Sequence, residues 1–346
     1  MSKTIWYQIY YQDKNLCILQ THGIQPEIYK LLKDNVFVLI SFSWVLESDK
    51  LQELIKFFPK GYNTKKYVYL LVNSQDEFDM ANGFSDLFNI VLWNNACRIL
   101  EKNFLIPDLK LYKMKPREFK CVMNSRLTKF KKHYLTYNID NIAYITMTDK
   151  DPQKSLCNCS SNVICDQCAF TPIELKTVEC SKSPSSKIYT NINANKICEI
   201  LDKSDMGIIL SPYEGACYSS LEYLCRGLPV ISTKATGGRM SFYNNFNSII
   251  CEDNENSLKD AINTCLIKLD NNEFNRKKIR EDAIKKIIYF RNVFISITDE
   301  IFEMYNINIV AKNYFNDKLD DFTFYQIYSN ISQHLDIIKS AINNIV

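Results

Sequence analysis

Residues 204–251 read SDMGIILSPYEGACYSSLEYLCRGLPVISTKATGGRMSFYNNFNSIIC. The apolar run GIIL predicts a buried strand, and Glu214 follows it in a loop. A helix is expected at about 217–226, because Gly227 suits a helix C-cap and Pro229 cannot continue a helix. The run PVIS predicts a second strand, and a loop with two glycines follows it. This order of strand, loop, helix and strand is typical of a parallel α/β sheet.

The loop and the start of the helix are the predicted ligand-binding region. In open α/β sheets, ligands bind beyond the carboxyl ends of the strands, where a helix N-terminus offers N–H groups and a positive dipole end to phosphate. Glu214 in the loop and Glu222, which lies off the apolar face of the helix, carry carboxylates that accept hydrogen bonds from sugar hydroxyls. We therefore predict a nucleotide sugar as the ligand. The other predicted donor-binding residues are Gly215, Ala216, Cys217, Tyr218 and Ser219.

Short apolar runs alternate with helical stretches through much of the chain, and this alternation predicts doubly wound parallel sheets. Strands are expected at 15–19, 36–40, 67–72, 90–93, 119–123, 142–147, 207–210 and 229–232. Two prolines and several lysines interrupt the pattern at 106–117 and indicate a domain break. We expect an α/β fold with two Rossmann-like domains facing a cleft. Residues 1–115 would form the acceptor side, residues 116–300 the nucleotide-sugar-binding domain, and residues 301–346 C-terminal helices that pack across both.

Composition excludes several other classes of protein. Among 346 residues, 46% are hydrophobic and 23% are charged, which fits a packed core and argues against disorder. The net charge of +3 is too small and too dispersed for a nucleic-acid-binding surface. The N-terminus lacks a signal-peptide pattern, and no run of about 18 apolar residues occurs. We therefore expect a cytoplasmic protein whose 13 cysteines are mostly reduced, and peripheral association with the inner face of the membrane stays open.

The 204–251 stretch resembles the retaining GT-B glycosyltransferases of group 1 (family 4). The shared pattern is a glutamate, seven residues, a second glutamate, then G-x-P-V-I-x-T and a Gly-Gly pair. The resemblance implies that Glu214 contacts the transferred sugar and that Glu222 accepts hydrogen bonds from the ribose hydroxyls. The family commonly has glycine where this chain has Cys217, so the approach of this loop to the sugar phosphate is expected to differ.

A second motif, NSRLTKFKKH at 124–133, follows an expected strand. It resembles the R-L-x-x-x-K element of the same family, in the form found in a bacterial polysaccharide-type subgroup. The resemblance implies that Arg126 and Lys131 bind the donor diphosphate. Two cations at one strand end, beside a helix N-terminus at another, would neutralise a departing pyrophosphate without a metal. Glu214, Arg126 and Lys131 are therefore the predicted catalytic residues, and no cofactor is expected for catalysis.

Plainer interpretations exist for these residues, because most glutamates and lysines are solvated surface charges. His133 follows the basic motif and could cap or pack at a helix start instead of contacting the donor. His22, in the strand-end sequence LQTHGI, could face the cleft or serve the fold. We carry both histidines forward as candidate cleft residues.

A cysteine-rich insertion is expected at about 149–186. The close spacing of four cysteines in CNCSSNVICDQC is compatible with a structural zinc that would brace a loop and take no part in catalysis. The alternative is a reduced surface insertion without metal. The candidate ligands are Cys157, Cys159, Cys165 and Cys168.

The predicted function is transfer of a sugar from a UDP- or GDP-type donor to an acceptor hydroxyl of a surface polysaccharide or glycolipid. Only the family resemblance implies retention at the anomeric carbon. A nucleotide-sugar epimerase of the same fold and a zinc-containing nucleic-acid-binding protein are the alternatives. Neither alternative accounts for the ordered glutamates, Pro-Val-Ile and Gly-Gly pair, so no nucleic-acid partner is expected.

Overall fold

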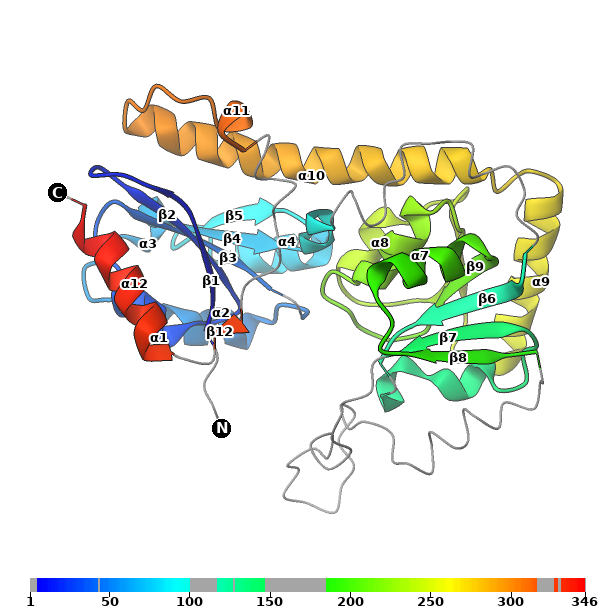
Figure 1. The fold of residues 1–346 in the computed structure, drawn as a ribbon. Coiled ribbons are helices and arrows are strands. Elements are labelled where there is room, and N and C mark those ends of the chain that lie inside the picture. The colour runs from blue at the N-terminus through cyan, green and yellow to red at the C-terminus, as the bar shows by residue number, and fades with distance from the viewer. Residues whose placement is uncertain are drawn as a thin grey trace, which may run out of the picture.

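The computed structural model describes residues 5–42, 44–99, 117–126, 128–146, 185–315, 327–328 and 331–345. Two α/β domains lie next to each other beneath one long helix, the N-terminal domain in blue and cyan and the C-terminal domain in green and yellow (Figure 1). Each domain is built on a six-stranded sheet. The expected pair of Rossmann-like domains is confirmed.

The N-terminal sheet has the strand order β12-β1-β2-β3-β4-β5. Strands β2 to β5 are parallel, while β1 pairs antiparallel with β2 and β12. Every residue of β3 and β4 is buried, as expected for central strands covered on both faces. The strands are β1 (Ile5–Gln12), β2 (Cys17–His22), β3 (Val36–Ser41), β4 (Val68–Val72), β5 (Asn89–Leu92) and β12 (Ile327–Tyr328). The helices are α1 (Pro26–Tyr29), α2 (Ser48–Ile55), α3 (Thr64–Tyr67), α4 (Gln75–Asn82) and the 3-10 helix η1 (Asn95–Arg98).

The C-terminal sheet is wholly parallel, with the order β11-β10-β9-β6-β7-β8. Its order reverses at β6 and β9, and ligands bind at such a switch point in open α/β sheets. Its strands are β6 (Phe119–Asn124), β7 (Ile142–Thr146), β8 (Lys187–Thr190), β9 (Ser204–Ile209), β10 (Val230–Thr233) and β11 (Ser248–Cys251). Its helices are η3 (Lys129–Lys131), η4 (His133–Thr136), α7 (Ala194–Asp202), α8 (Tyr218–Cys225), η5 (Gly238–Phe242) and α9 (Glu255–Asp270).

The eight strands expected from apolar runs are all present as β2 to β7, β9 and β10. The strand predictions missed β1, β8, β11 and β12. Strands β8 and β11 lie at the two edges of the C-terminal sheet and are half exposed, so they lack the continuous apolar runs that marked the central strands. Edge strands therefore account for the missed elements in this domain.

One helix, α10 (Arg276–Met304), runs across both domains (Figure 1). The side chain of Asn275 caps its first turn by accepting from the amide of Lys278. Near its middle, the buried guanidinium of Arg291 donates to the carbonyls of Cys97, at 2.9 Å, and Ile99, at 2.8 Å. The helix thus ties the end of the N-terminal sheet to the C-terminal domain. The sequence predicted crossing helices at residues 301–346, whereas α10 begins at Arg276. The predicted boundary between residues 115 and 116 lies outside the described residues.

The C-terminal end of the chain returns to the N-terminal domain. Helix α12 (Ile331–Asn343) places Ile338 and Ile342 in the same buried cluster as Ile5 and Leu19, and α11 (Ala311–Phe315) packs against α10. Helix α12 therefore packs on the N-terminal domain. None of the helices in the described ranges is both long and apolar enough to cross a membrane.

The carboxyl ends of the two sheets face each other. Asn94, which follows β5, donates from Nδ2 to the carbonyl of Gly238 at 2.8 Å. The hydroxyl of Tyr218, at the start of α8, donates to the carbonyl of Asn95 at 3.1 Å. These contacts bring the loops after the strands of both domains to one cleft, where ligands bind in folds of this kind.

Candidate active site

The loop after β9 carries Glu214 and is held against the glycine loop after β10. The amide of Glu214 donates to the carbonyl of Thr236 at 3.0 Å, and the amide of Gly238 donates to the carbonyl of Gly215 at 2.6 Å. At Gly237 the backbone has φ +108°, and an added Cβ would lie 1.8 Å from the carbonyl oxygen of Glu214. Only glycine fits there, because both the conformation and the space exclude a side chain. The Gly-Gly pair thus positions the acidic loop.

The carboxylate of Glu214 is almost buried and has two partners. The hydroxyl of Ser211 donates to its Oε1 at 2.6 Å, and Lys131 forms an ion pair with the same oxygen. Ser211 in turn accepts from Nη1 of Arg239 at 2.8 Å. The side chain of Arg239 is fully buried and also donates to the carbonyl of Thr233 at 2.8 Å. The glutamate therefore has a fixed orientation that does not depend on Lys131 alone.

Arg239 is a site residue that sequence reasoning missed. It directly follows the glycine pair, in the stretch GGRM. A charged residue directly after the glycine pair, in the first turn of η5, was the available signal. Its burial could not be read from the sequence, because charged residues are mostly exposed.

A cavity of about 550 Å³ lies in front of Glu214 between the two domains. The structure brings the predicted residues Arg126, Lys131 and Glu214 together in its wall. Four further predicted donor-binding residues, Ala216, Cys217, Tyr218 and Ser219, line the same cavity, and Gly215 lies between Glu214 and Ala216. Basic side chains, a carboxylate and the start of a helix are thus gathered at one place.

Helix α8 begins directly at this cavity. Its N-cap residue, Cys217, has φ 50° and ψ 74°, in the left-handed region that glycine adopts most easily. A positive φ favours glycine, the residue that the resemblance led us to expect at this position. Burial, followed by the charge of Glu214, raises the pKa of the Cys217 thiol to about 11. The residue is therefore a neutral wall of the cavity.

Glu222 differs from its expected state. The sequence pattern predicted a carboxylate free to face a ligand, whereas Oε2 accepts from Nδ2 of Asn124 at 2.8 Å. Burial raises the pKa of Glu222 to about 7, and the hydrogen bond from Asn124 partly opposes that rise. Asn124 is the last residue of β6 and lines the cavity. Its side-chain amide therefore links the end of this strand to the carboxyl group of Glu222. Near neutral pH this carboxyl can therefore accept or donate a hydrogen bond.

The two histidines are both neutral groups. His133 is 1% exposed, its Nε2 lies 3.0 Å from the hydroxyl of Ser125, and burial followed by the charge of Lys131 lowers its pKa to about 3. The Nδ1 of His22 lies 3.2 Å from the hydroxyl of Ser41. Burial followed by the charge of Arg98 lowers the pKa of His22 to about 4. His133 thus stands behind Ser125, which lines the cavity, while His22 is not among the lining residues.

The N-terminal domain contributes Trp44, which sequence reasoning also missed. Trp44 follows β3 and lines the cavity. Its ring lies 6.0 Å from that of Phe130 and 6.4 Å from that of Tyr213, and these two rings stack on each other at 5.6 Å. The only signal for Trp44 in the sequence was its position after the carboxyl end of an expected strand. The aromatic contact joins the two domains at the mouth of the cavity.

The four candidate zinc ligands, Cys157, Cys159, Cys165 and Cys168, lie outside the described residues. Among the residues that are described, no group of three or more His, Cys, Asp or Glu side chains is arranged to hold a metal ion. The zinc hypothesis therefore stays a prediction.

Residues 161–286 match the family model of the glycosyl transferases group 1. This range contains Glu214, Glu222 and the glycine pair, so the resemblance to group 1 is confirmed for this part of the chain, and the retaining type stays a prediction. No curated protein sequence matches the chain.

Solved structures share the fold. A mutant of S. aureus TarM, in complex with Fondaparinux, alpha-GlcNAc-glycerol and UDP, is 16% identical with a TM-score of 0.53, over 76% of this chain and 51% of that one. Anabaena HepE in complex with UDP is 14% identical with a TM-score of 0.53, over 77% and 72% of the two chains. A glycosyltransferase from Rickettsia africae is 17% identical with a TM-score of 0.54, over 78% and 71%. The chain spans about half the length of TarM, and at such identities the similarity establishes the GT-B fold alone.

Proposed function

We propose that this chain, a GT-B protein with a group 1 glycosyl transferase match over residues 161–286, transfers a sugar from a nucleotide-sugar donor to an acceptor hydroxyl. One observation carries the proposal. Two cations from the segment that follows β6, a fixed carboxylate from the loop after β9 and the start of α8 line a single cavity between the domains. A ligand with an anionic centre and hydroxyl groups on both sides suits that combination.

Arg126 and Lys131 are the proposed partners of the donor diphosphate. The N-terminus of α8, at Cys217 to Ser219, adds backbone N–H groups and the positive end of the helix dipole. Positive charge that is already in place stabilises the negative charge that develops on a departing diphosphate. In this mechanism the two side chains and the helix supply that charge, and no divalent metal is needed.

Glu214 is the proposed contact of the transferred sugar. Its bond from Ser211 holds the carboxylate when Lys131 shares its charge with the incoming diphosphate. A carboxylate in that position accepts from a sugar hydroxyl and orients the anomeric carbon toward the acceptor. Glu222, with Asn124 beside it, is the proposed contact of the ribose hydroxyls.

The donor class is proposed to be UDP or GDP type, and the acceptor a surface polysaccharide or glycolipid. HepE and TarM were both solved with UDP, which supports UDP as the first donor to test. Retention at the anomeric carbon is proposed from the family resemblance. Closure of the two domains around the cavity would exclude water and limit hydrolysis of the donor. We place the enzyme in the cytoplasm, with peripheral association with the membrane when the acceptor is a lipid.

The test is thermal unfolding of the full chain with UDP, GDP, CMP and their sugar conjugates, with and without a divalent metal. A nucleotide at about 100 times its Kd stabilises a protein by roughly 2.7 kcal/mol, which is readily measured. We expect one nucleotide to stabilise the wild type without metal and to lose that effect in Arg126→Ala. Arg117→Ala is the matched control. It also removes one positive charge, but Arg117 precedes the first residue of β6, whereas Arg126 follows the last. Stabilisation by no nucleotide, or equal loss in both variants, would contradict the proposal.

A further inference from the structure

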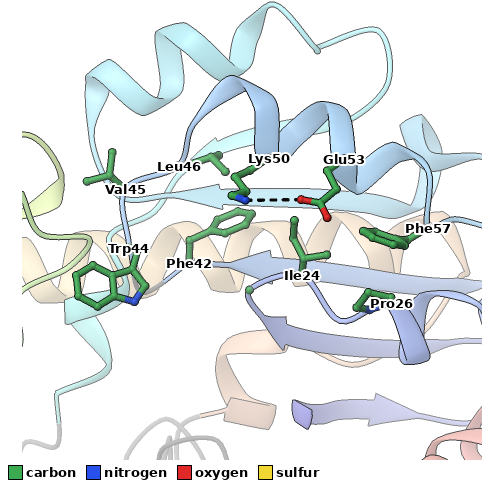
Figure 2. Close-up of a pocket in the computed structure, with 10 residues that line it drawn as sticks. Ile24, Pro26, Phe42, Trp44, Val45, Leu46, Lys50, Glu53 and Phe57 are labelled. Carbon is green, nitrogen blue, oxygen red and sulfur yellow. Dashed lines mark ion pairs between the residues drawn. The ribbon is translucent and has the colours of Figure 1, made fainter. Parts of the chain in front are cut away.

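A second cavity, of about 410 Å³, lies in the N-terminal domain. Figure 2 shows it beneath α2, with Ile24 and Phe42 below the helix and Phe57 at one end. Ile24 and Phe57 are half buried, and Phe42 is 8% exposed. Such a volume is in the range of small-molecule sites.

The cavity offers a ligand mainly apolar surface. Lys50 and Glu53 are the charged residues among its described lining, and their side chains pair with each other at 3.7 Å (Figure 2). Two backbone donors in the wall are already used within the protein. The amide of Leu46 donates to Oε1 of Glu77 at 3.1 Å, and the amide of Gly23 donates to the carbonyl of Ser41 at 2.7 Å.

The apolar lining of this cavity favours some kinds of ligand over others. A peptide would bring backbone N–H and C=O groups that lose water and need partners, and an unpaired buried group is costly. An alkyl chain needs no such partners and gains from the removal of its surface from water. The lining therefore favours a hydrocarbon chain.

Trp44 connects this cavity with the active-site cavity. It lines both of them, and 49% of its surface is exposed. In Figure 2 its ring points away from the apolar pocket, and the rings it approaches, Phe130 and Tyr213, belong to the C-terminal domain. The two cavities therefore lie on either side of one exposed side chain, Trp44.

We propose that this pocket binds the alkyl chain of the acceptor, so that the acceptor is an amphiphile of glycolipid type whose hydroxyl passes Trp44 to meet the donor. This inference rests on the proposed glycosyl transfer. The hydrocarbon would anchor the acceptor, and the hydroxyl-bearing end would lie between the domains.

The test compares the binding of methyl and octyl glucoside to the full chain by calorimetry, with both compounds below micelle-forming concentrations. Each methylene that leaves water contributes roughly a fourfold gain in affinity, so burial of two or more gives at least about a tenfold preference for the octyl compound. We expect this preference in the wild type and its loss in Ile24→Glu. Ile55→Glu makes the same change on α2 outside the pocket lining and should keep the preference. Phe57→Gln is a second pocket variant if Ile24→Glu does not fold.

Equal affinity for the two glucosides, or a preference that persists in both folded pocket variants, would overturn the assignment. Tighter binding of an unlipidated aromatic peptide than of octyl glucoside would also overturn it. Stabilisation by UDP is measured in the same samples. If UDP binds and chain length has no effect, the pocket assignment alone fails; if octyl glucoside binds and no nucleotide does, the proposed transferase function fails.

Discussion

Replacing Lys131 with methionine removes a positive charge from the active-site cavity and leaves the length of the side chain nearly unchanged. The lysine side chain is only 18% exposed, so water screens its charge weakly. At a separation of about 4 Å and an effective dielectric constant of about 20, a unit charge on the diphosphate interacts with this lysine by ~4 kcal/mol. Loss of one preorganised group that stabilises transition-state charge typically lowers kcat about 10²–10³-fold. We expect kcat/KM to fall by a factor in that range.

The assay is the initial rate of nucleotide release from the donor that stabilises the wild type. Lys132→Met is the matched control, because Lys132 pairs with Asp253 and does not line the cavity. Unfolding must be followed in parallel: Glu214 keeps its bond from Ser211 but loses its ion pair, so the free energy of unfolding should drop by ~1–3 kcal/mol. Rates should therefore be compared at a temperature where both variants are folded. Activity of Lys131→Met within tenfold of wild type, or an equal loss in both variants, would refute the assignment.

Burial raises the pKa of Glu222 from its ordinary value of 4.5 to about 7, so the folded protein keeps a proton that the unfolded chain releases. The free energy of unfolding should therefore fall as pH rises through that window, and Glu222→Gln should flatten this dependence in thermal unfolding at several pH values; a slope unchanged in the variant would contradict it. Ser211→Ala removes the bond to Glu214 and should lower kcat roughly 10–100-fold in steady-state kinetics, while an unaltered kcat would argue against a positioning role. Gly207→Ala places a Cβ 2.0 Å from the ring of Tyr223 and should cost ~1–3 kcal/mol in urea unfolding, a result that an unshifted midpoint would exclude.

The central strands of both sheets could be predicted from the sequence, because strands covered on both faces need continuous apolar runs such as 36–41 and 68–72. The half-exposed edge strands lacked that signal. The ordered stretch around Glu214 was readable for a similar local reason. A strand end, a helix cap and a glycine loop are encoded within a few residues of one another.

The tertiary structure alone decided which distant residues meet. Arg239 could be recognised as a support of Glu214 only once its guanidinium was seen buried against Ser211. The state of Glu222 depends on Asn124, which is far away in the chain but lies beside it in the folded domain.

The apolar pocket, and its contact with the active-site cavity at Trp44, could likewise be recognised only in the tertiary structure. Residue types and spacing along the chain determine local conformation, because those energies arise between near neighbours. Burial, pKa and cavity shape arise from surfaces that only the packed fold brings together. The sequence by itself therefore determined the fold class and the motif that carries the proposed chemistry. Only the folded protein decided which side chains support that motif and where an apolar pocket lies beside it.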